Sequence, residues 1–445
     1  MTVNDLLIKN ARIIDPASGM DETGDILISG KVIKQIGANL NASATNTIDA
    51  SGLIACPGFI DLHCHLRQPG YENKETIASG AAAACHGGFT TICCMPNTNP
   101  PMDNAAIINY VKNTAATEAP QINILPVGCI TKNREGKELT EMFELSEAGC
   151  AGFSDDGSSV NDSRLISLAM ETCNNLGLPV IEHCEDPALA HNGQINDGWV
   201  AARLGLSGIP AAAEESIVAR DIALSEMTGA KLHLTHISTR GSVELIRNAK
   251  KKGLHVTADV TPHHLTLTEE RVMNSGNNTG VSLSYDTNAK VNPPLRTAAD
   301  IDALVAGLND GTIDAIATDH APHAREDKLC EFELAAFGIS GFETAFGALM
   351  TLVHSNKIKL STLIKCLTSN PAGIINYKNG ITGAIKLSNK ADIVLLDINH
   401  EWTVETENML SYGKNTPYAG QQFKGLVAAT IHDGIIVYKD NSIRT

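Results

Sequence analysis

PGFIDLHCHLR, residues 57–67, joins an apolar run to two histidines and an arginine. The apolar residues predict a buried strand, whereas His63, His65 and Arg67 are costly to bury without partners. Residues two apart in a strand share a face, so these three side chains are expected to point the same way, with Cys64 on the other face. The stretch therefore predicts a buried strand that ends in a polar site.

Seven further apolar runs follow, and several are nearly continuous, as in parallel strands that are buried on both faces. They are GFTTICCMPN (88–97), INILPVGCI (122–130), CAGFSDD (150–156), LPVIEHCED (178–186), KLHLTHIS (231–238), LHVTADVTPHH (254–264) and TIDAIATDHAP (312–322). Amphipathic segments lie between them, for example residues 74–88, 163–177 and 214–229. Eight strand-helix units without a glycine-rich phosphate turn predict an α/β protein with a (β/α)8 barrel of the TIM type, and disfavour a doubly wound sheet.

Glycines follow several of the helical segments and precede the next strand. Gly87, Gly177, Gly229 and Gly253 occupy this place. A left-handed residue commonly ends a helix there, and glycine adopts that conformation without strain. We expect all four to cap helices in this way.

The two ends of the chain have a different pattern. Residues 1–56 and 378–445 contain short alternating runs joined by Gly and Asp turns, such as DILISGKVIKQIG and LVAATIHDGIIVYKD. Both flanks are therefore expected to be β-rich. They predict one small β-sandwich domain built from both termini, with the barrel formed by residues 57–377.

Composition excludes several classes of function. The chain has 445 residues, a formal net charge of -16 and no run of Lys and Arg longer than Lys250 to Lys252, which argues against nucleic-acid and anionic-membrane surfaces. No uncharged apolar stretch reaches the length of a membrane span, and the N-terminus lacks the pattern of a signal peptide. The 11 cysteines are odd in number and often lie in apolar runs, which favours reduced thiols. We expect a cytoplasmic protein.

Ionisable residues gather where the predicted strands end, which in a barrel of this type is where reactive groups lie. They are His63 and His65 on the first strand, Asp155 and Asp156 on the fourth, His183 on the fifth, His236 on the sixth and Asp319 on the eighth. On the sixth strand, alternation predicts that Leu232, Leu234 and His236 share a face. His263 and His264 end the seventh strand, and a supporting role for them stays open. His86, His233, His255, His354 and His432 receive no role.

Four histidines and two aspartates on one rim match the ligand chemistry of zinc. A single histidine at a strand end is more often an ordinary polar residue, so the evidence is the combination. Six ligands are too many for one tetrahedral ion but suit two ions that share a carboxylate. Two such ions activate water and polarise a carbonyl, which is hydrolytic chemistry.

The motifs taken together resemble the amidohydrolase superfamily, and within it the class I dihydroorotases, over essentially the whole chain. The matching stretches are PGFIDLHCHLRQPG, TTICCMPNTNP, GFSDDG, IEHCED, THISTRGS, TPHH, VNPPLR, ATDHAPH, FGISGFET and NTPYAG. The resemblance implies the barrel, the terminal β-sandwich, and the reversible conversion of N-carbamoyl-L-aspartate to L-dihydroorotate in pyrimidine synthesis. It also implies zinc as cofactor, with two ions expected.

The resemblance assigns roles to individual residues. His63 and His65 would bind one ion and His183 and His236 the other, while Asp319 would ligate the first ion and move a proton. Asp156 would bridge the ions in place of the modified lysine of many relatives, with Asp155 as the alternative. The residues implied in substrate binding are Arg67, Asn97, Asn292, His323, Phe337 and Gly338. For Asn292, which precedes two prolines, a turn-forming role is the rival interpretation.

Two other functions remain open at this point. A hydantoinase or allantoinase would act on related cyclic amides, although such relatives use the lysine bridge that the SDDG segment lacks. An inactive dihydroorotase-like scaffold subunit would be expected to lose the metal histidines, and all four are present. A homodimer and an association with aspartate transcarbamoylase are implied by the resemblance alone.

Overall fold

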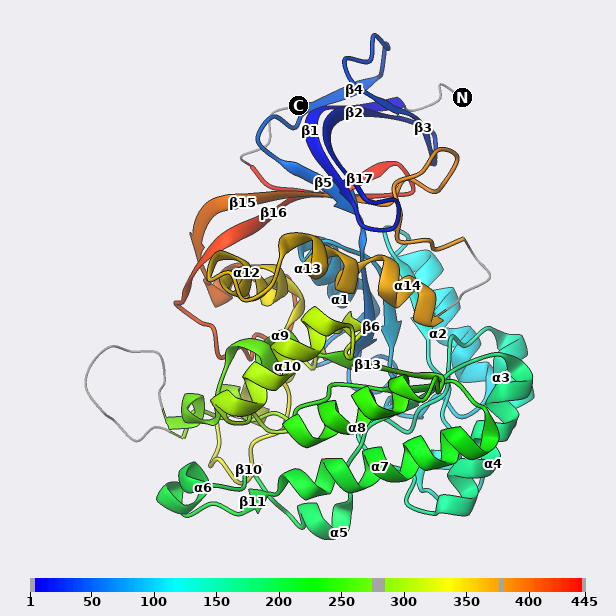
Figure 1. The fold of residues 1–445 in the computed structure, drawn as a ribbon, viewed down its shortest axis with the longest axis vertical. Coiled ribbons are helices and arrows are strands. Elements are labelled where there is room, and N and C mark those ends of the chain that lie inside the picture. The colour runs from blue at the N-terminus through cyan, green and yellow to red at the C-terminus, as the bar shows by residue number, and fades with distance from the viewer. Residues whose placement is uncertain (1–4, 274–284, 376–379, 442–445) are drawn as a thin grey trace.

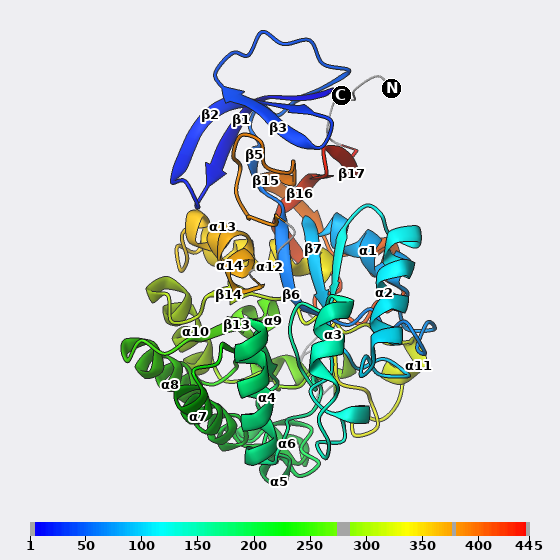
Figure 2. The ribbon, with the colours of Figure 1, turned by 90° about the vertical axis from the view of Figure 1, so that its right-hand side faces the viewer.

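A ring of parallel strands forms the centre of the molecule, and helices surround it (Figures 1 and 2). The computed structural model describes residues 5–273, 285–375 and 380–441. Seven of the eight predicted barrel strands are regular. They are β6 (Phe59–Cys64), β7 (Phe89–Cys94), β8 (Asn123–Pro126), β9 (Val180–Glu182), β12 (Leu232–Leu234), β13 (Val256–Val260) and β14 (Ala315–Ile316). The predicted fold class is confirmed.

Single bridges complete the barrel where regular pairing stops. Phe153 pairs in parallel with Gly128 on one side and with Val180 on the other, so the predicted fourth strand is reduced to one bridging residue. Cys64 pairs with His320 and closes the ring between the first and the eighth strands. The barrel is therefore closed, and the carboxyl ends of its strands lie around one mouth of the barrel.

One helix follows each strand along the chain. These helices are α1 (Ile77–His86), α2 (Ala105–Glu118), α3 (Met142–Ala148), α4 (Ser163–Leu176), α7 (Ala211–Thr228), α8 (Arg240–Lys251), α10 (Ala298–Asp310) and α12 (Phe342–His354). Shorter helices occupy the connections and the region after α12. They are α5 (Pro187–Ala190), α6 (Trp199–Leu204), α9 (Pro262–Thr266), α11 (Arg325–Lys328), α13 (Leu360–Leu367) and α14 (Ser369–Ile375).

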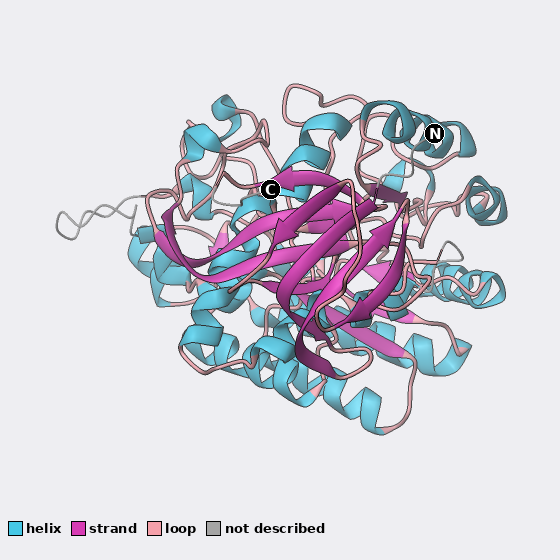
Figure 3. Ribbon diagram, turned by 90° about the horizontal axis from the view of Figure 1, so that it is seen from above, coloured by secondary structure: helices cyan, strands magenta, loops and turns pink. Residues whose placement is uncertain are grey.

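Strands from both ends of the chain form one sheet above the barrel (Figure 3). Its order is β17-β16-β15-β5-β1-β2-β3, with β4 paired to β1. The bounds are β1 (Asp5–Asp15), β2 (Met20–Ser29), β3 (Val32–Gly37), β4 (Asn46–Asp49), β5 (Ile54–Pro57), β15 (Ile393–Thr403), β16 (Gln422–His432) and β17 (Ile435–Lys439). Ile33 of β3 and Ile431 of β16 share one buried cluster although their strands are far apart in this order. The sheet thus folds over a core of its own, and the predicted terminal β domain is a single continuous sheet.

The domain boundary predicted near residue 378 lies outside the described residues, because residues 376–379 are not described. At the other boundary, β5 leads into β6 with only Gly58 between them. The terminal sheet is therefore tied directly to the strand that bears the first two histidines of the site. Among the residues that the structure describes, no helix has both the length and the apolar character that a membrane span requires.

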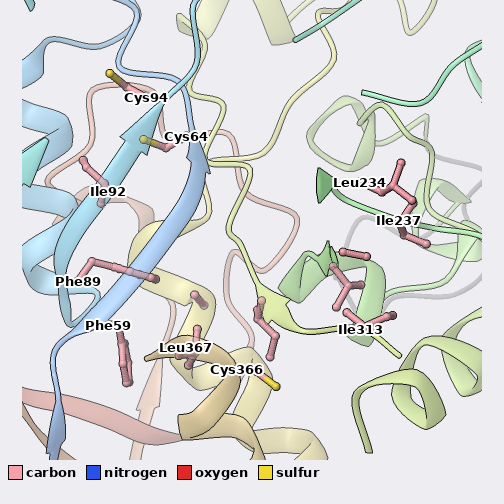
Figure 4. Close-up of a cluster of buried hydrophobic side chains, with 14 of the residues drawn as sticks. Phe59, Cys64, Phe89, Ile92, Cys94, Leu234, Ile237, Ile313, Cys366 and Leu367 are labelled. Atoms are coloured by element: carbon pink, nitrogen blue, oxygen red, sulfur yellow. The ribbon is translucent and has the colours of Figure 1, made fainter. Parts of the chain in front are cut away.

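Two apolar layers hold the barrel strands in place. The outer layer joins strands to helices, and Figure 4 shows Phe59 and Phe89 within it, with ring centroids 5.7 Å apart. The inner layer fills the barrel axis with residues such as Ile60, Leu62 and Ala317. The residues of the predicted site lie beyond these layers, at one end of the barrel.

The structure corrects the strand alternation that we expected. Between Asp61 and Cys64 the pairing of β6 with β7 shifts by one residue, so Leu62 belongs to the inner layer and His63 also faces the interior. On the sixth strand the expectation was wrong. Leu232 and Leu234 pack in the outer layer with the helices, and a positive φ of 40° turns His236 inward.

Candidate metal centre and active site

The six predicted metal ligands converge at the end of the barrel, and all are buried. His63 Nε2 lies 3.3 Å from Asp156 Oδ1, and His65 Nε2 lies 3.0 Å from Asp319 Oδ1. His183 Nδ1 and His236 Nε2 each lie 3.6 Å from Asp156 Oδ1. Asp156 is thus adjacent to all four histidines, since its Oδ2 is also 3.6 Å from His65 Nε2.

Two groups of these residues have ligand atoms close enough to share an ion. One consists of His63, Asp156 and His236, and the other of His63, His65 and Asp319. Asp155, the alternative to Asp156, accepts hydrogen bonds from the amides of Ile130 and Thr131. The geometry therefore favours Asp156 for the central position.

The polar atoms of this cluster are suited to a cation. His63 Nε2 and Asp156 Oδ1 are buried and have no hydrogen-bond partner among the described residues, which is costly unless an ion satisfies them. Burial disfavours a charged His63, but the neighbouring carboxylates, Asp156 foremost, outweigh it and raise its pKa to about 10. Burial also opposes the charge on Asp319, but the histidines, His65 foremost, hold its pKa well below its ordinary value. The field that favours a proton here also favours a metal cation.

A cavity of about 210 Å³ opens beside the predicted metal ligands. All of the residues that the resemblance implied in substrate binding line it, namely Arg67, Asn97, Asn292, His323, Phe337 and Gly338. His63 lies behind this surface and does not line the cavity. The structure therefore joins the predicted ligands and the predicted substrate residues in one place.

The lining residues differ in how much of their hydrogen-bonding capacity is free. Asn292 Oδ1 is buried and has no hydrogen-bond partner in the described part of the chain, which supports a contact with a ligand more than a turn-forming role. Asn97 Oδ1 lies 2.9 Å from His65 Nδ1, so this amide also orients a predicted metal ligand. Arg67 Nε donates to the carbonyl of Pro322, while Arg67 Nη2 lies 3.3 Å from His323 Nε2.

His323 is held as a neutral imidazole. Burial, together with the positive charges of Arg67, Lys328 and Lys74, lowers its pKa to about 2. Its Nε2 lies 2.8 Å from the carbonyl oxygen of Phe337, to which it donates. The ring therefore links the loop after β14 to the segment at Phe337 and Gly338.

Several residues of the site escaped the sequence interpretation. Asp61 accepts hydrogen bonds from the amide and the hydroxyl of Thr318, next to Asp319. Asp259 contacts His233 and Thr235 inside the barrel. An acidic residue within each apolar strand was the available signal, because a buried carboxylate requires partners. His264, for which the sequence left a supporting role open, donates from Nε2 to the carbonyl of Pro293 and so supports the loop that bears Asn292.

A third group of possible ligands lies in the terminal sheet and has a simpler explanation. Asp392, His432 and Asp433 are close together there. Lys31 Nζ lies 2.9 Å from Asp433 Oδ2, and Lys390 Nζ lies 3.8 Å from Asp433 Oδ1. Because two ammonium groups already balance this carboxylate, we assign no metal to the group.

A family model and curated relatives both match this chain to dihydroorotases. Residues 52–242 match a family model described as Dihydro-orotase-like. The chain is 49% identical to a dihydroorotase of Thermoanaerobacter sp. (strain X514) over 98% of this chain and 97% of that protein. It is 48% identical to a dihydroorotase of Caldanaerobacter subterraneus subsp. tengcongensis, with 98% of each chain covered.

Solved structures show the same fold at lower identity. The L-hydantoinase (dihydropyrimidinase) of Arthrobacter aurescens superposes with a TM-score of 0.86 at 24% identity, and the match covers 99% of this chain and 97% of that one. A dihydropyrimidinase of Brevibacillus agri gives a TM-score of 0.82 at 22% identity. At this level of identity the likeness supports the barrel with its terminal β domain, and not a shared substrate.

Proposed function

The chain belongs to the dihydroorotase family, and from this premise we propose that it interconverts N-carbamoyl-L-aspartate and L-dihydroorotate as a cyclic amide hydrolase of pyrimidine biosynthesis. The observation that carries the proposal is that Asp156, Asp319, His183 and His236 line the same cavity as Arg67. Such a pocket combines groups for hydrolytic chemistry with a forked cation for a carboxylate.

We propose that the cofactor is zinc and that two ions bind. His63, His65 and Asp319 would hold one ion, His183 and His236 the other, and Asp156 would lie between them. The support is the donor set of imidazole nitrogens and carboxylate oxygens, which zinc accepts. When bound, such ions lower the pKa of water and polarise a carbonyl.

Asp319 would move the proton of the reaction. Its carboxylate is ionised, because the nearby histidines hold its pKa well below the ordinary value despite burial. In ring opening, Asp319 would accept the proton of the attacking water and deliver it to the amide nitrogen that leaves. Ring closure would use the same carboxylate in reverse, as base and then acid.

The substrate would be oriented through its carboxylate. Arg67 supplies the charge and the forked geometry, and Asn97, Asn292 and His323 surround the same cavity. The backbone at Phe337 and Gly338 lies next to His323 and would contact the amide edge of the ring. This arrangement would direct the cyclic amide toward Asp319.

The experiment compares dihydroorotate, hydantoin and allantoin as substrates of the zinc-loaded protein. We expect turnover of dihydroorotate, and formation of dihydroorotate from N-carbamoyl-L-aspartate at lower pH. Turnover of hydantoin alone would replace the proposed substrate. Absence of turnover with all three substrates would support the scaffold alternative. His63→Ala tests the site, because activity at the wild-type rate in that variant would mean that the site does not perform the reaction.

Further proposals follow from the resemblance. We propose a cytoplasmic homodimer that associates with aspartate transcarbamoylase, with residues 57–377 as the catalytic unit and residues 1–56 and 378–445 as the terminal β domain. Sedimentation of the purified protein, alone and mixed with aspartate transcarbamoylase, tests the assembly. A single monomeric species in both samples would contradict it.

A further inference from the structure

A polar layer lies inside the barrel, behind the metal ligands. His63 Nδ1 lies 2.7 Å from Thr235 Oγ1, and this hydroxyl lies 3.0 Å from Asp259 Oδ2. His233 Nε2 lies 2.8 Å from the same oxygen of Asp259. All of these side chains are buried, so water does not compete for their hydrogen bonds.

The available protons determine which group donates in each hydrogen bond between His63, Thr235 and Asp259. The Asp259 carboxylate can only accept: its Oδ1 accepts from the backbone amide of His236, and its Oδ2 lies 2.8 Å from His233 Nε2. The single hydroxyl proton of Thr235 must therefore go to Asp259. The hydroxyl oxygen then accepts from His63, which must keep its proton on Nδ1. Nε2, the His63 nitrogen that faces Asp156, is therefore the one left to bind a cation once the cation has displaced its proton.

The Asp259 carboxylate also contacts His236, a ligand of the second proposed ion. Asp259 Oδ1 accepts a hydrogen bond of 2.7 Å from the backbone amide of His236. His236 has a φ of 40°, a left-handed conformation that is costly for a residue with a side chain. The hydrogen bond stabilises the turn that brings the His236 ring to the cavity.

We propose that Asp259 is a positioning residue that prepares both halves of the metal site, holding His63 in one tautomer through Thr235 and holding His236 through its backbone amide. The inference rests on the proposed function and deepens it. Groups behind metal-bound histidines orient the ring, and their loss commonly weakens metal binding by about 10- to 100-fold. Asp259 differs from a group that orients a single ligand, because its one carboxylate positions a ligand of each proposed ion.

The experiment measures zinc affinity by competition with a chelating dye, and so does not depend on turnover. Thr235→Val keeps the shape of the side chain but removes the hydroxyl, and we expect zinc to bind about 10- to 100-fold more weakly. Thr235→Ser restores the hydroxyl and should recover affinity close to that of the wild type. Thr257→Val is the matched control, because Thr257 Oγ1 contacts His233 Nδ1 at 2.9 Å but no metal ligand.

Asp259→Asn is the second variant, used with circular dichroism to establish that each protein is folded. An amide nitrogen facing Thr235 would donate to its hydroxyl, reverse the hydrogen bond and move the His63 proton to Nε2. We expect zinc affinity to fall at least as far as in Thr235→Val, with an altered visible spectrum when cobalt replaces zinc. Unchanged zinc affinity in folded Thr235→Val and Asp259→Asn would overturn the inference and leave the proposed function intact. A wild-type protein that binds no zinc would overturn both.

Discussion

Three residues of the site depend on left-handed backbone conformations. Arg67, His236 and Asp319 have φ values of 61°, 40° and 44°. None is glycine or asparagine, so each conformation costs about 1–2 kcal/mol and must be held by its surroundings. Strand alternation does not extend to such residues, because each lies beyond the end of its strand. The sequence predicted that these residues matter, but not the turns that direct them.

Replacing Asp319 by Asn tests its role as the group that moves the proton. An amide cannot accept a proton at neutral pH, so we expect kcat for ring opening to fall by about 10²- to 10⁴-fold. Measuring bound zinc in the same preparation separates loss of the base from loss of a ligand. Asp302→Asn, at an exposed aspartate, is the control. A wild-type kcat in Asp319→Asn would exclude the proposed base.

Arg67→Lys tests whether the forked guanidinium holds the substrate. Lysine keeps the charge but cannot donate two parallel hydrogen bonds to a carboxylate. Hydrogen bonds to charged groups contribute about 1.5–3 kcal/mol, so kcat/KM for dihydroorotate should fall by about 10- to 100-fold, mainly through KM. Arg12→Lys, in an exposed ion pair with Asp21, should change nothing. An unaltered KM in Arg67→Lys would place the substrate carboxylate elsewhere.

At the scale of elements, the sequence predicted the order of strands and helices well. Helices α4 and α7 end at Gly177 and Gly229, which have φ values of 72° and 70° as expected, and Gly253 beyond α8 has 78°. The prediction of a left-handed cap at Gly87 was wrong, because its φ is -75°. Glycine is needed there for space, since a Cβ would lie 2.4 Å from the Phe342 carbonyl oxygen. Local patterns indicate conformation, but they do not reveal which distant backbone passes close by.

Gly338 offers a test of the segment that faces the cavity. Its φ is 142°, and a Cβ would lie 2.7 Å from the Ala321 carbonyl oxygen and 3.0 Å from His323 Nε2. Gly338→Ala should therefore displace His323 and raise KM several-fold more than it lowers kcat. Gly373→Ala, in α14 with nothing within 4 Å, is the control and should stabilise the protein by about 0.5–1 kcal/mol. Equal KM values in the two variants would show that the segment tolerates the change.

At the scale of the molecule, the site unites residues separated by more than half of the chain. The hydrogen bond between His65 and Asp319 spans 254 positions. The sequence predicted this convergence because parallel barrel strands end at one rim, a rule that holds whatever their separation. It did not predict the polar layer at Thr235 and Asp259. That layer arises from contacts across the barrel interior, and no periodicity within a single strand encodes them.

Removal of the metal should reveal how much its binding to the gathered site residues stabilises the whole fold. Without a metal ion, Asp156 Oδ1 and His63 Nε2 have no hydrogen-bond partner among the residues described, and the unfolded chain cannot gather the six distant predicted ligands. Zinc that binds only the folded state stabilises it by about 4 kcal/mol when free zinc exceeds the Kd about a thousandfold. Calorimetry should therefore show a lower Tm after chelation and recovery when zinc is restored. His63→Ala should respond less to zinc, since His63 belongs to both groups of possible ligands in the barrel. A wild-type Tm that is the same with and without zinc would mean that the ligands are held by the fold alone.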